Sequence, residues 1–187
     1  MANWTIDTVH SEIGFKIKHL VISTVSGKFS SFEGRLDGDP DDLKNARISF
    51  TADVDSIHTG SEQRDGHLKS ADFFDTARYS KLSFVSTKIE HKDEHEYKVT
   101  GDLTIKAVTK QITLNVEFGG IQNNFYGQTV AGFEITGKIN RHDFGLTWSA
   151  VTEAGGVVVS DEVKLVINTE LVKEAVLASP GITLQRK

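Results

Sequence analysis

The sequence predicts an all-β fold in which about eight amphipathic strands form a sandwich or a closed barrel. Apolar and polar residues alternate with a period of two in most segments, which is the pattern of strands with one dry face and one wet face. Only residues 61–70 show a helical pattern, so helices are too few to cover the apolar faces. The sheet must cover itself, and glycines inside several strands favour the curvature of an eight-stranded antiparallel barrel.

Three strands are predicted in the first 54 residues. In the strand at 13–17, isoleucine and phenylalanine alternate with lysine. The run at 25–36 changes phase at Phe32, which indicates a β-bulge or a sharp bend in one long strand. A third strand, 48–54, follows the turn-rich segment DGDPDDLKN.

A polar segment interrupts the strands before the alternation resumes. Residues 61–70 predict a short helical crossover in which Ser61 caps the first turn, and Gly66 weakens the helical pattern. Strands at 82–89 and 97–105 form a hairpin across the polar sequence HKDEHE. The last three predicted strands are 112–118, 131–139 and 163–167.

The composition excludes several kinds of site and partner. The chain of 187 residues has no cysteine, which excludes disulfides, thiolate zinc sites and iron–sulfur clusters, and its single methionine is the initiator. A net charge of −5 without a basic patch argues against a nucleic-acid partner. Neither a secretory signal nor a run of 18 apolar residues is seen, so we expect a cytoplasmic protein without membrane insertion.

Five blocks of sequence resemble the YceI-like family, in order and with similar spacing. They are WTIDTVHSEIGFKIKHL, STVSGKFSSFEGRL, DSIHTGSEQRDGHLKSADFFD, YKVTGDLTIKAVTKQITL, and INRHDFGLTW with SDEVKLVI. The resemblance implies an extended, lipocalin-like barrel whose tubular interior holds a polyisoprenoid, an isoprenoid quinone or a fatty-acid-like lipid. We expect one barrel domain, 1–172, and a C-terminal tail, 173–187, that lies outside the match and could form a dimer contact.

The inward apolar side chains are the candidate ligand contacts. Alternation alone favours a packed core, because amphipathic strands look the same around a ligand and around one another. The resemblance favours a hollow interior instead, with Phe73 and Phe74 at a mouth of the barrel. The candidate lining residues are Phe15, Ile17, Phe29, Phe50, Phe73, Phe74, Phe84, Leu103, Ile105, Leu114, Val116, Phe133 and Ile135.

The polar residues around the crossover have three interpretations. A hydrogen-bonded network that fixes the crossover to the barrel rim is favoured, since half-buried polar groups need partners. Histidines and aspartates could form an acid–base or metal cluster, but neither HExxH nor GxSxG is present. An arginine could meet a head group such as a phosphate. The candidate rim residues are His19, His58, Arg64, Asp65, His67 and Arg141.

These observations lead to a functional hypothesis with two alternatives. We expect a non-enzymatic protein that binds and sequesters or transports a long-chain apolar lipid, with no metal, cofactor or catalytic residue. One alternative is an enzyme that acts on a lipid-like substrate through His and Asp residues at the barrel mouth. The other is a stress-related interaction module in which the tail holds a homodimer together.

Overall fold

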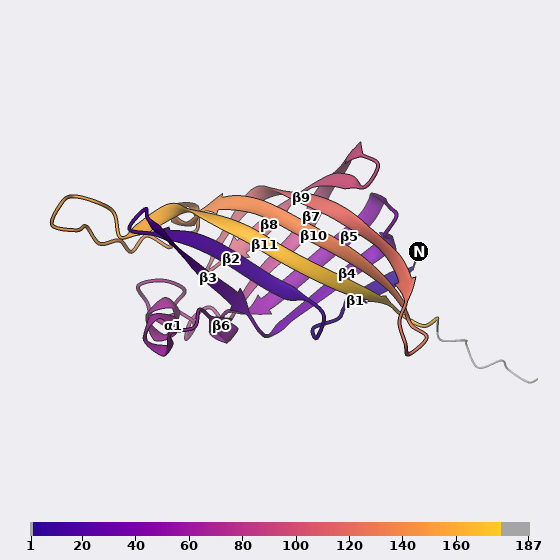
Figure 1. Cartoon of the computed structure of the whole chain (residues 1–187), viewed down its shortest axis with the longest axis horizontal. Helices are drawn as coiled ribbons and strands as arrows, with labels where there is room; N and C mark the ends of the chain where they lie inside the picture. The colour runs from indigo at the N-terminus through magenta and orange to yellow at the C-terminus, as the bar shows by residue number, and fades with distance from the viewer. Residues whose placement is uncertain (1, 177–187) are drawn as a thin grey trace, which may run out of the picture.

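The chain forms an antiparallel sheet that closes on itself as a barrel (Figure 1). The structure is a computed structural model that describes residues 2–176. Eight strands follow one another around the ring, and the last pairs with the first, so the predicted eight-stranded barrel is confirmed. In ring order they are β1 (Asn3–Ile6), β4 (Phe32–Asp39), β5 (Asp42–Asp53), β7 (Lys81–Asp93), β8 (Glu96–Ile105), β9 (Val108–Asn123), β10 (Thr129–Asn140) and β11 (Val159–Lys173).

Three further strands extend the sheet at one end of the barrel. They are β2 (Glu12–His19), β3 (Ser23–Phe29) and β6 (Ile57–His58). β2 pairs with the first part of β11, β3 pairs with β2, and β6 pairs with β3. The sequence predicts β3 and β4 as one bent strand; the structure divides them at Ser30 and Ser31, because β3 bonds to β2 and β6 whereas β4 bonds to β1 and β5. Neither β1 nor β6 is predicted, since so few residues show no alternation.

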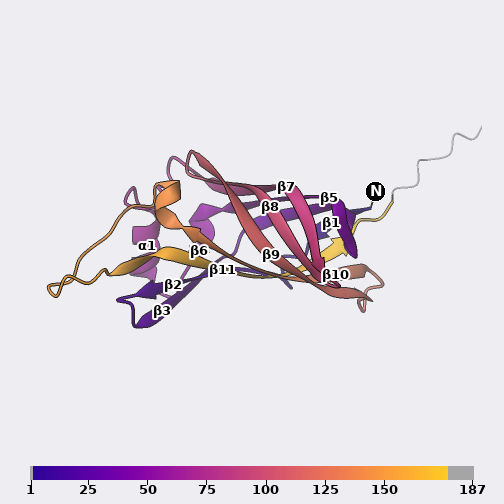
Figure 2. The ribbon, with the colours of Figure 1, turned by 90° about the horizontal axis from the view of Figure 1, so that it is seen from above.

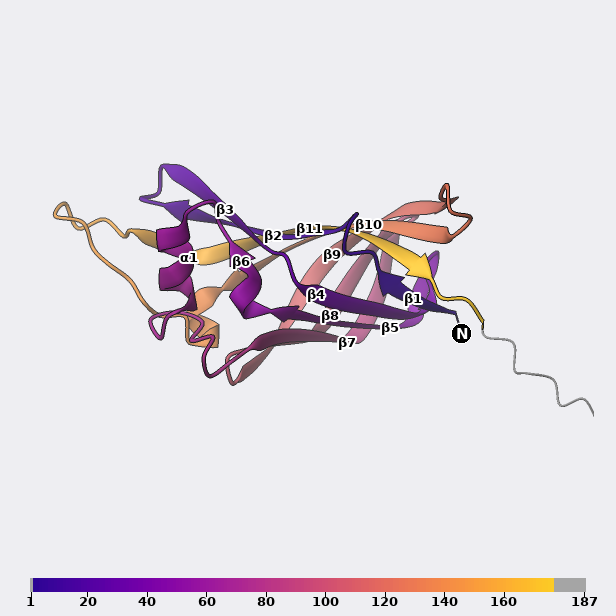
Figure 3. The same cartoon turned by 90° about the horizontal axis from the view of Figure 1, so that it is seen from below.

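The crossover between β5 and β7 lies at the same end as the β2–β3 hairpin (Figures 2 and 3). It contains the 3-10 helix η1 (Val54–Ser56), β6 and the α-helix α1 (Glu62–Lys69). The Ser61 hydroxyl accepts a hydrogen bond from the Arg64 amide at 3.3 Å, which confirms the predicted cap. None of the helices in residues 2–176 has the length and apolar character needed to span a bilayer.

The hydrophobic core lies inside the barrel. At the end opposite α1, Trp4, Leu36 and Leu43 are each at most 2% exposed. At the other end, the 3-10 helix η2 (Arg141–Phe144) buries Phe144 and ends at Gly145, whose φ of 74° is a left-handed conformation that glycine adopts without strain. The barrel mouth is the end bounded by α1, η2, the β2–β3 hairpin and the loop at 147–158.

Candidate functional site

A cavity of about 430 Å³ occupies the barrel interior. This volume falls within the range of roughly 300–1,000 Å³ that is usual for small-molecule sites. Every strand contributes to its wall, and the wall is almost entirely apolar. Among the described residues that line the cavity there is no Asp or Glu. Such an interior suits an apolar molecule and provides no carboxylate for general acid–base chemistry.

All thirteen apolar residues predicted to line the interior lie on the cavity wall. Eleven of them lie on strands, where the side chains alternate between two faces and the alternation predicts the inward one; Phe73 and Phe74 lie in the segment after α1. That these side chains contact a ligand stays a prediction. Leu146 and Trp148 also line the cavity, and they are not predicted because the loop after η2 has no alternating pattern. Both residues belong to the block INRHDFGLTW, so the family resemblance is the sequence feature that could have identified them.

Aromatic side chains gather at the barrel mouth. The ring centroids of His67 and Trp148 are 4.8 Å apart, and those of Phe73 and Trp148 are 5.4 Å apart. Phe73 and Phe74 both line the cavity, as the prediction places them. His67 Nε2 lies 2.8 Å from a carboxylate oxygen of Asp72. The segment after α1 therefore presents rings to the lumen and keeps its charge at the surface.

Thr59 connects Arg64 and Asp65 on the crossover. The Thr59 amide donates to the buried Asp65 carboxylate at 2.9 Å, and the Thr59 hydroxyl donates to it as well. Arg64 Nη2 donates to the Thr59 carbonyl at 2.7 Å. Burial favours a higher pKa for Asp65, but the bonds from Thr59 together with nearby His58 hold that pKa below its usual value. The carboxylate is thus kept charged to anchor α1.

Arg141 is a buried cation that organises the loop at the mouth. Its guanidinium donates to the carbonyls of Leu146 at 2.6 Å, Trp148 at 2.7 Å and Ser160 at 2.9 Å. Burial lowers the pKa of Arg141, and the carboxylate of Asp161 at 3.7 Å opposes that change. Because carbonyls occupy most of its donors, Arg141 joins η2 to both ends of the loop at 147–158.

The predicted rim residues do not form one network. His19, Arg64, His67 and Arg141 line the cavity, whereas His58 and Asp65 are not among the lining residues. The ion pairs near α1 are separate contacts within the crossover, such as His58 with Asp65 at 3.4 Å and Asp75 with Arg78 at 3.6 Å. The favoured role of these residues, a network that fixes the crossover to the barrel rim, stays a prediction. His10 lies outside the crossover.

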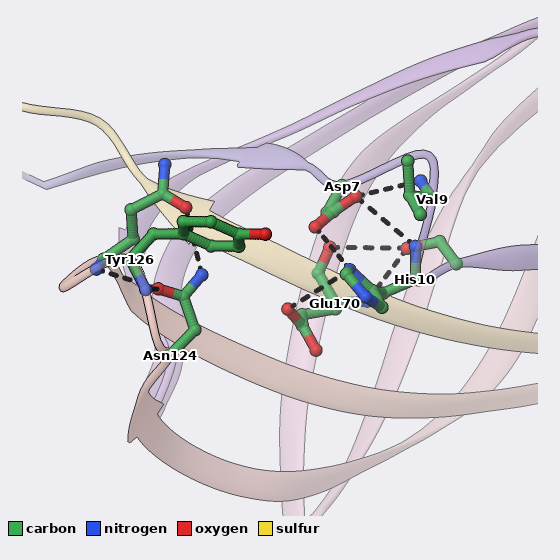
Figure 4. Close-up of polar contacts among 8 residues, drawn as sticks. Asp7, Val9, His10, Asn124, Tyr126 and Glu170 are labelled. Carbon is green, nitrogen blue, oxygen red and sulfur yellow. Dashed lines mark hydrogen bonds and ion pairs between the residues drawn. The ribbon is translucent and has the colours of Figure 1, made fainter.

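His10 belongs to a cluster with Asp7 and Glu170, two residues that the sequence analysis does not identify (Figure 4). His10 Nδ1 lies 2.8 Å from an Asp7 carboxylate oxygen and 3.9 Å from Glu170. The Asp7 amide also donates to the Glu170 carbonyl at 2.8 Å. One ligand atom from each residue lies within 4.8 Å of the others, a spacing that could hold a metal ion. The cluster ties the corner between β1 and β2 to β11 and does not line the cavity.

Comparison with known proteins gives consistent matches over nearly the whole chain. The model of the YceI-like domain family matches residues 4–171. A UPF0312 protein of Staphylococcus epidermidis is 43% identical over 171 residues, which cover 91% of this chain and 97% of that protein. The crystal structure of the Campylobacter jejuni YCEI protein has a TM-score of 0.72 and 35% identity, and the match covers 90% of this chain and 96% of that one.

A more distant structure shares the fold. It is a polyisoprenoid binding domain from Saccharophagus degradans, which matches with a TM-score of 0.62 and 16% identity over 91% of this chain and 98% of that one.

Proposed function

The chain belongs to the YceI-like family, and on that premise we propose that it binds a long-chain apolar lipid inside its barrel without acting on it chemically. The observation that carries this proposal is the apolar cavity, whose described lining contains no carboxylate. The polyisoprenoid binding domain of Saccharophagus degradans supports a polyisoprenoid as the first ligand to test. An isoprenoid quinone or a fatty-acid-like chain offers the same apolar surface.

The energetics favour a chain over a compact ligand. At about 0.8 kcal/mol per buried CH₂, a chain of about twenty carbons gains roughly 16 kcal/mol before costs. Lost translational and rotational freedom offsets about 4–15 kcal/mol of that gain. The remainder is about 1–12 kcal/mol, and it reaches micromolar to nanomolar dissociation constants when this cost is below about 8 kcal/mol. Directional contacts are not needed, so a wall made of phenylalanine, leucine, isoleucine and valine suffices.

Two experiments test the proposal: detection of a bound lipid, and a substitution that fills the cavity. Native mass spectrometry after mild purification should show a protein with a bound mass that organic extraction releases. Ile135→Trp places an indole in the lumen, because Ile135 lines the cavity, and it should abolish retention of a long prenyl probe. The matched control is Thr136→Trp, since Thr136 is the next residue of β10 and is exposed. An empty protein that also refuses prenyl probes would contradict the proposal.

An enzyme acting at the barrel mouth remains a second candidate because of one arrangement. His67 lines the cavity, and its Nε2 lies 2.8 Å from Asp72, which is a geometry that allows proton transfer. His58 is 62% exposed and is not among the cavity-lining residues, so it does not share this position. If the protein is an enzyme, His67→Gln should abolish turnover of a lipid substrate while binding persists. Loss of both together, or no turnover by the unmodified protein, argues for binding alone.

The interaction-module alternative depends on the tail at 173–187. Residues 177–187 lie outside the described part of the chain, so the dimer contact expected there stays a prediction. Removing residues 177–187 and measuring the solution mass tests it: a dimer that becomes a monomer would support that role.

A further inference from the structure

Two adjoining loops at the barrel mouth expose apolar side chains, which we call the apolar tip: Leu20, Val21, Ile22, Val151 and Val157. The first three form the β2–β3 turn, and the other two pair across the loop that precedes β11. The Leu20 amide donates to the Val158 carbonyl at 2.9 Å, which joins the two loops. Val158 and His19, the neighbours of these loops in sequence, line the lipid cavity. The apolar tip is therefore continuous with the entrance to the lumen.

The composition of the β2–β3 turn is unfavourable for folding. Leu20 and Val21 have φ angles of 52° and 66°, a left-handed conformation in which a β-branched residue is a strained outlier. Asn, Asp or Gly normally occupies such positions in tight hairpins. Val21 and Ile22 are also 74% and 85% exposed. Apolar residues that destabilise the fold and yet are exposed to solvent indicate that this turn contacts another molecule.

A row of lysines crosses the outer face of the adjacent wall. Lys16 on β2 lies directly opposite Lys164 on β11, which lies directly opposite Lys138 on β10. All three are exposed, as are Lys18 and Lys28 on the same outer face. Glu162 lies 3.7 Å from Lys138 and Glu12 lies 4.0 Å from Lys28, but within residues 2–176 no carboxylate lies within 4 Å of Lys16, Lys18 or Lys164. Like charges opposed across strands are destabilising, and an anionic partner would relieve them.

We propose that the barrel mouth docks on an anionic lipid bilayer, with the apolar tip dipping into the interface and the lysines meeting the head groups. At about 3.3 Å per residue, Lys16 lies roughly 13 Å along β2 from Leu20, and Lys18 lies about half as far. One wall of the barrel thus combines apolar and basic groups in a protein whose net charge is −5. Apolar insertion combined with attraction to anionic lipid is the usual basis of interfacial binding. This inference goes beyond lipid storage, because it places the entrance of the cavity against a membrane surface.

Flotation with vesicles tests the docking. The full chain should float with vesicles of equal parts phosphatidylcholine and phosphatidylglycerol, and it should not float with phosphatidylcholine alone. Added salt should weaken the binding, because it screens the attraction between the lysines and the anionic head groups. The paired changes Val21→Asn with Ile22→Ser, and Lys16→Gln with Lys164→Gln, should each weaken binding on the order of tenfold or more. Asn accepts the left-handed conformation, so the tip variant should fold at least as well as the unmodified chain.

Matched controls lie elsewhere on the barrel. Phe125→Ser with Tyr126→Ser removes two exposed aromatic side chains from the β9–β10 turn, which lies at the opposite end of the barrel (Figure 1). This change should leave flotation unchanged. Lys92→Gln with Lys98→Gln removes two exposed lysines on β7 and β8, close to the β7–β8 turn, with the same expectation. Equal loss in these controls would overturn the proposal. So would failure to float with anionic vesicles, equal flotation with neutral ones, or a dimer that the tip variant dissociates.

Lipid binding in the lumen is measured separately from binding to the vesicles. The tip and lysine variants should retain the prenyl probe once it is loaded, because none of the four changed side chains fills the cavity. An empty lumen with intact flotation would contradict the proposed lipid binding alone. A loaded lumen without flotation would contradict the docking alone.

Discussion

The tip of the Phe15 ring occupies the position that a Cβ atom on Gly27 would take, and the two residues are direct partners across β2 and β3. The Phe84 ring also lies where a Cβ atom on Gly101 would be, although the direct partner of Gly101 on β7 is Ser86. Each glycine lets a large ring lie close to the wall of the barrel. The width of the lumen therefore depends on residues that have no side chain.

Gly27→Ala should narrow the cavity, because the added methyl group leaves the Phe15 ring only the lumen to move into. Overpacking of this kind costs about 1–3 kcal/mol of folding stability. We expect a lower urea midpoint and weaker retention of a long prenyl probe. Gly132→Ala on β10 is the control, since nothing lies within 4 Å of the added Cβ. Equal behaviour of the two variants would show that the ring and the glycine are not coupled.

Arg141→Met should loosen the barrel mouth, because it leaves the buried carbonyl of Leu146 and the partly buried carbonyl of Trp148 without their donor. Each buried unsatisfied group costs about 1–3 kcal/mol, so we expect a loss of roughly 3–5 kcal/mol in chemical denaturation. Fluorescence of Trp148 should change as well. Arg78→Met is the control, since Arg78 is exposed and makes one ion pair. A similarly small loss of folding stability in both variants would show that Arg141 does not have this structural role.

Asp65→Ala should destabilise the crossover, because the Thr59 amide and hydroxyl lose a buried acceptor. The expected cost is about 1–3 kcal/mol. Hydrogen exchange should rise in residues 59–70 more than in β8 or β9 if the opening is local. Gln63→Ala changes an exposed residue of the same helix and should leave exchange unaltered. Unchanged exchange in the Asp65 variant would contradict the anchoring role.

The Asp7–His10 contact should make stability depend on pH. Its hydrogen bond raises the pKa of His10 above 6.5 and lowers the pKa of Asp7 below 3.8. The His10 contribution is complete below about pH 6.5 and is lost as pH rises through the raised pKa; the Asp7 contribution is complete above about pH 3.8 and is lost as pH falls through the lowered pKa.

His10→Gln should therefore reduce the difference in Tm between about pH 5 and about pH 8. The effect should be small because His10 is exposed. His95→Gln, at the exposed β7–β8 turn, should preserve the difference. An identical difference in the His10 variant would show that the contact does not contribute to stability.

The sequence predicts the barrel and the inward face of its strands because both depend on a local rule, whereas the hollow interior follows from the family resemblance. Side chains of a strand alternate between two faces, so Phe15, Phe133 and Ile135 could be placed inward before their neighbours in the barrel were known. The cap at Ser61 was equally accessible, since the hydrogen bond that it accepts comes from a residue three positions later.

Only the tertiary structure decides which outward-facing side chains lie next to one another. The opposition of Lys16, Lys164 and Lys138 brings together positions that are up to 148 residues apart. The contacts of Asp7 and His10 with Glu170 join positions 163 and 160 residues apart. Such contacts depend on strand register and ring closure, which no period in the sequence encodes. Alternation determined which side chains face the lumen, and long-range pairing determined which of the outward ones meet.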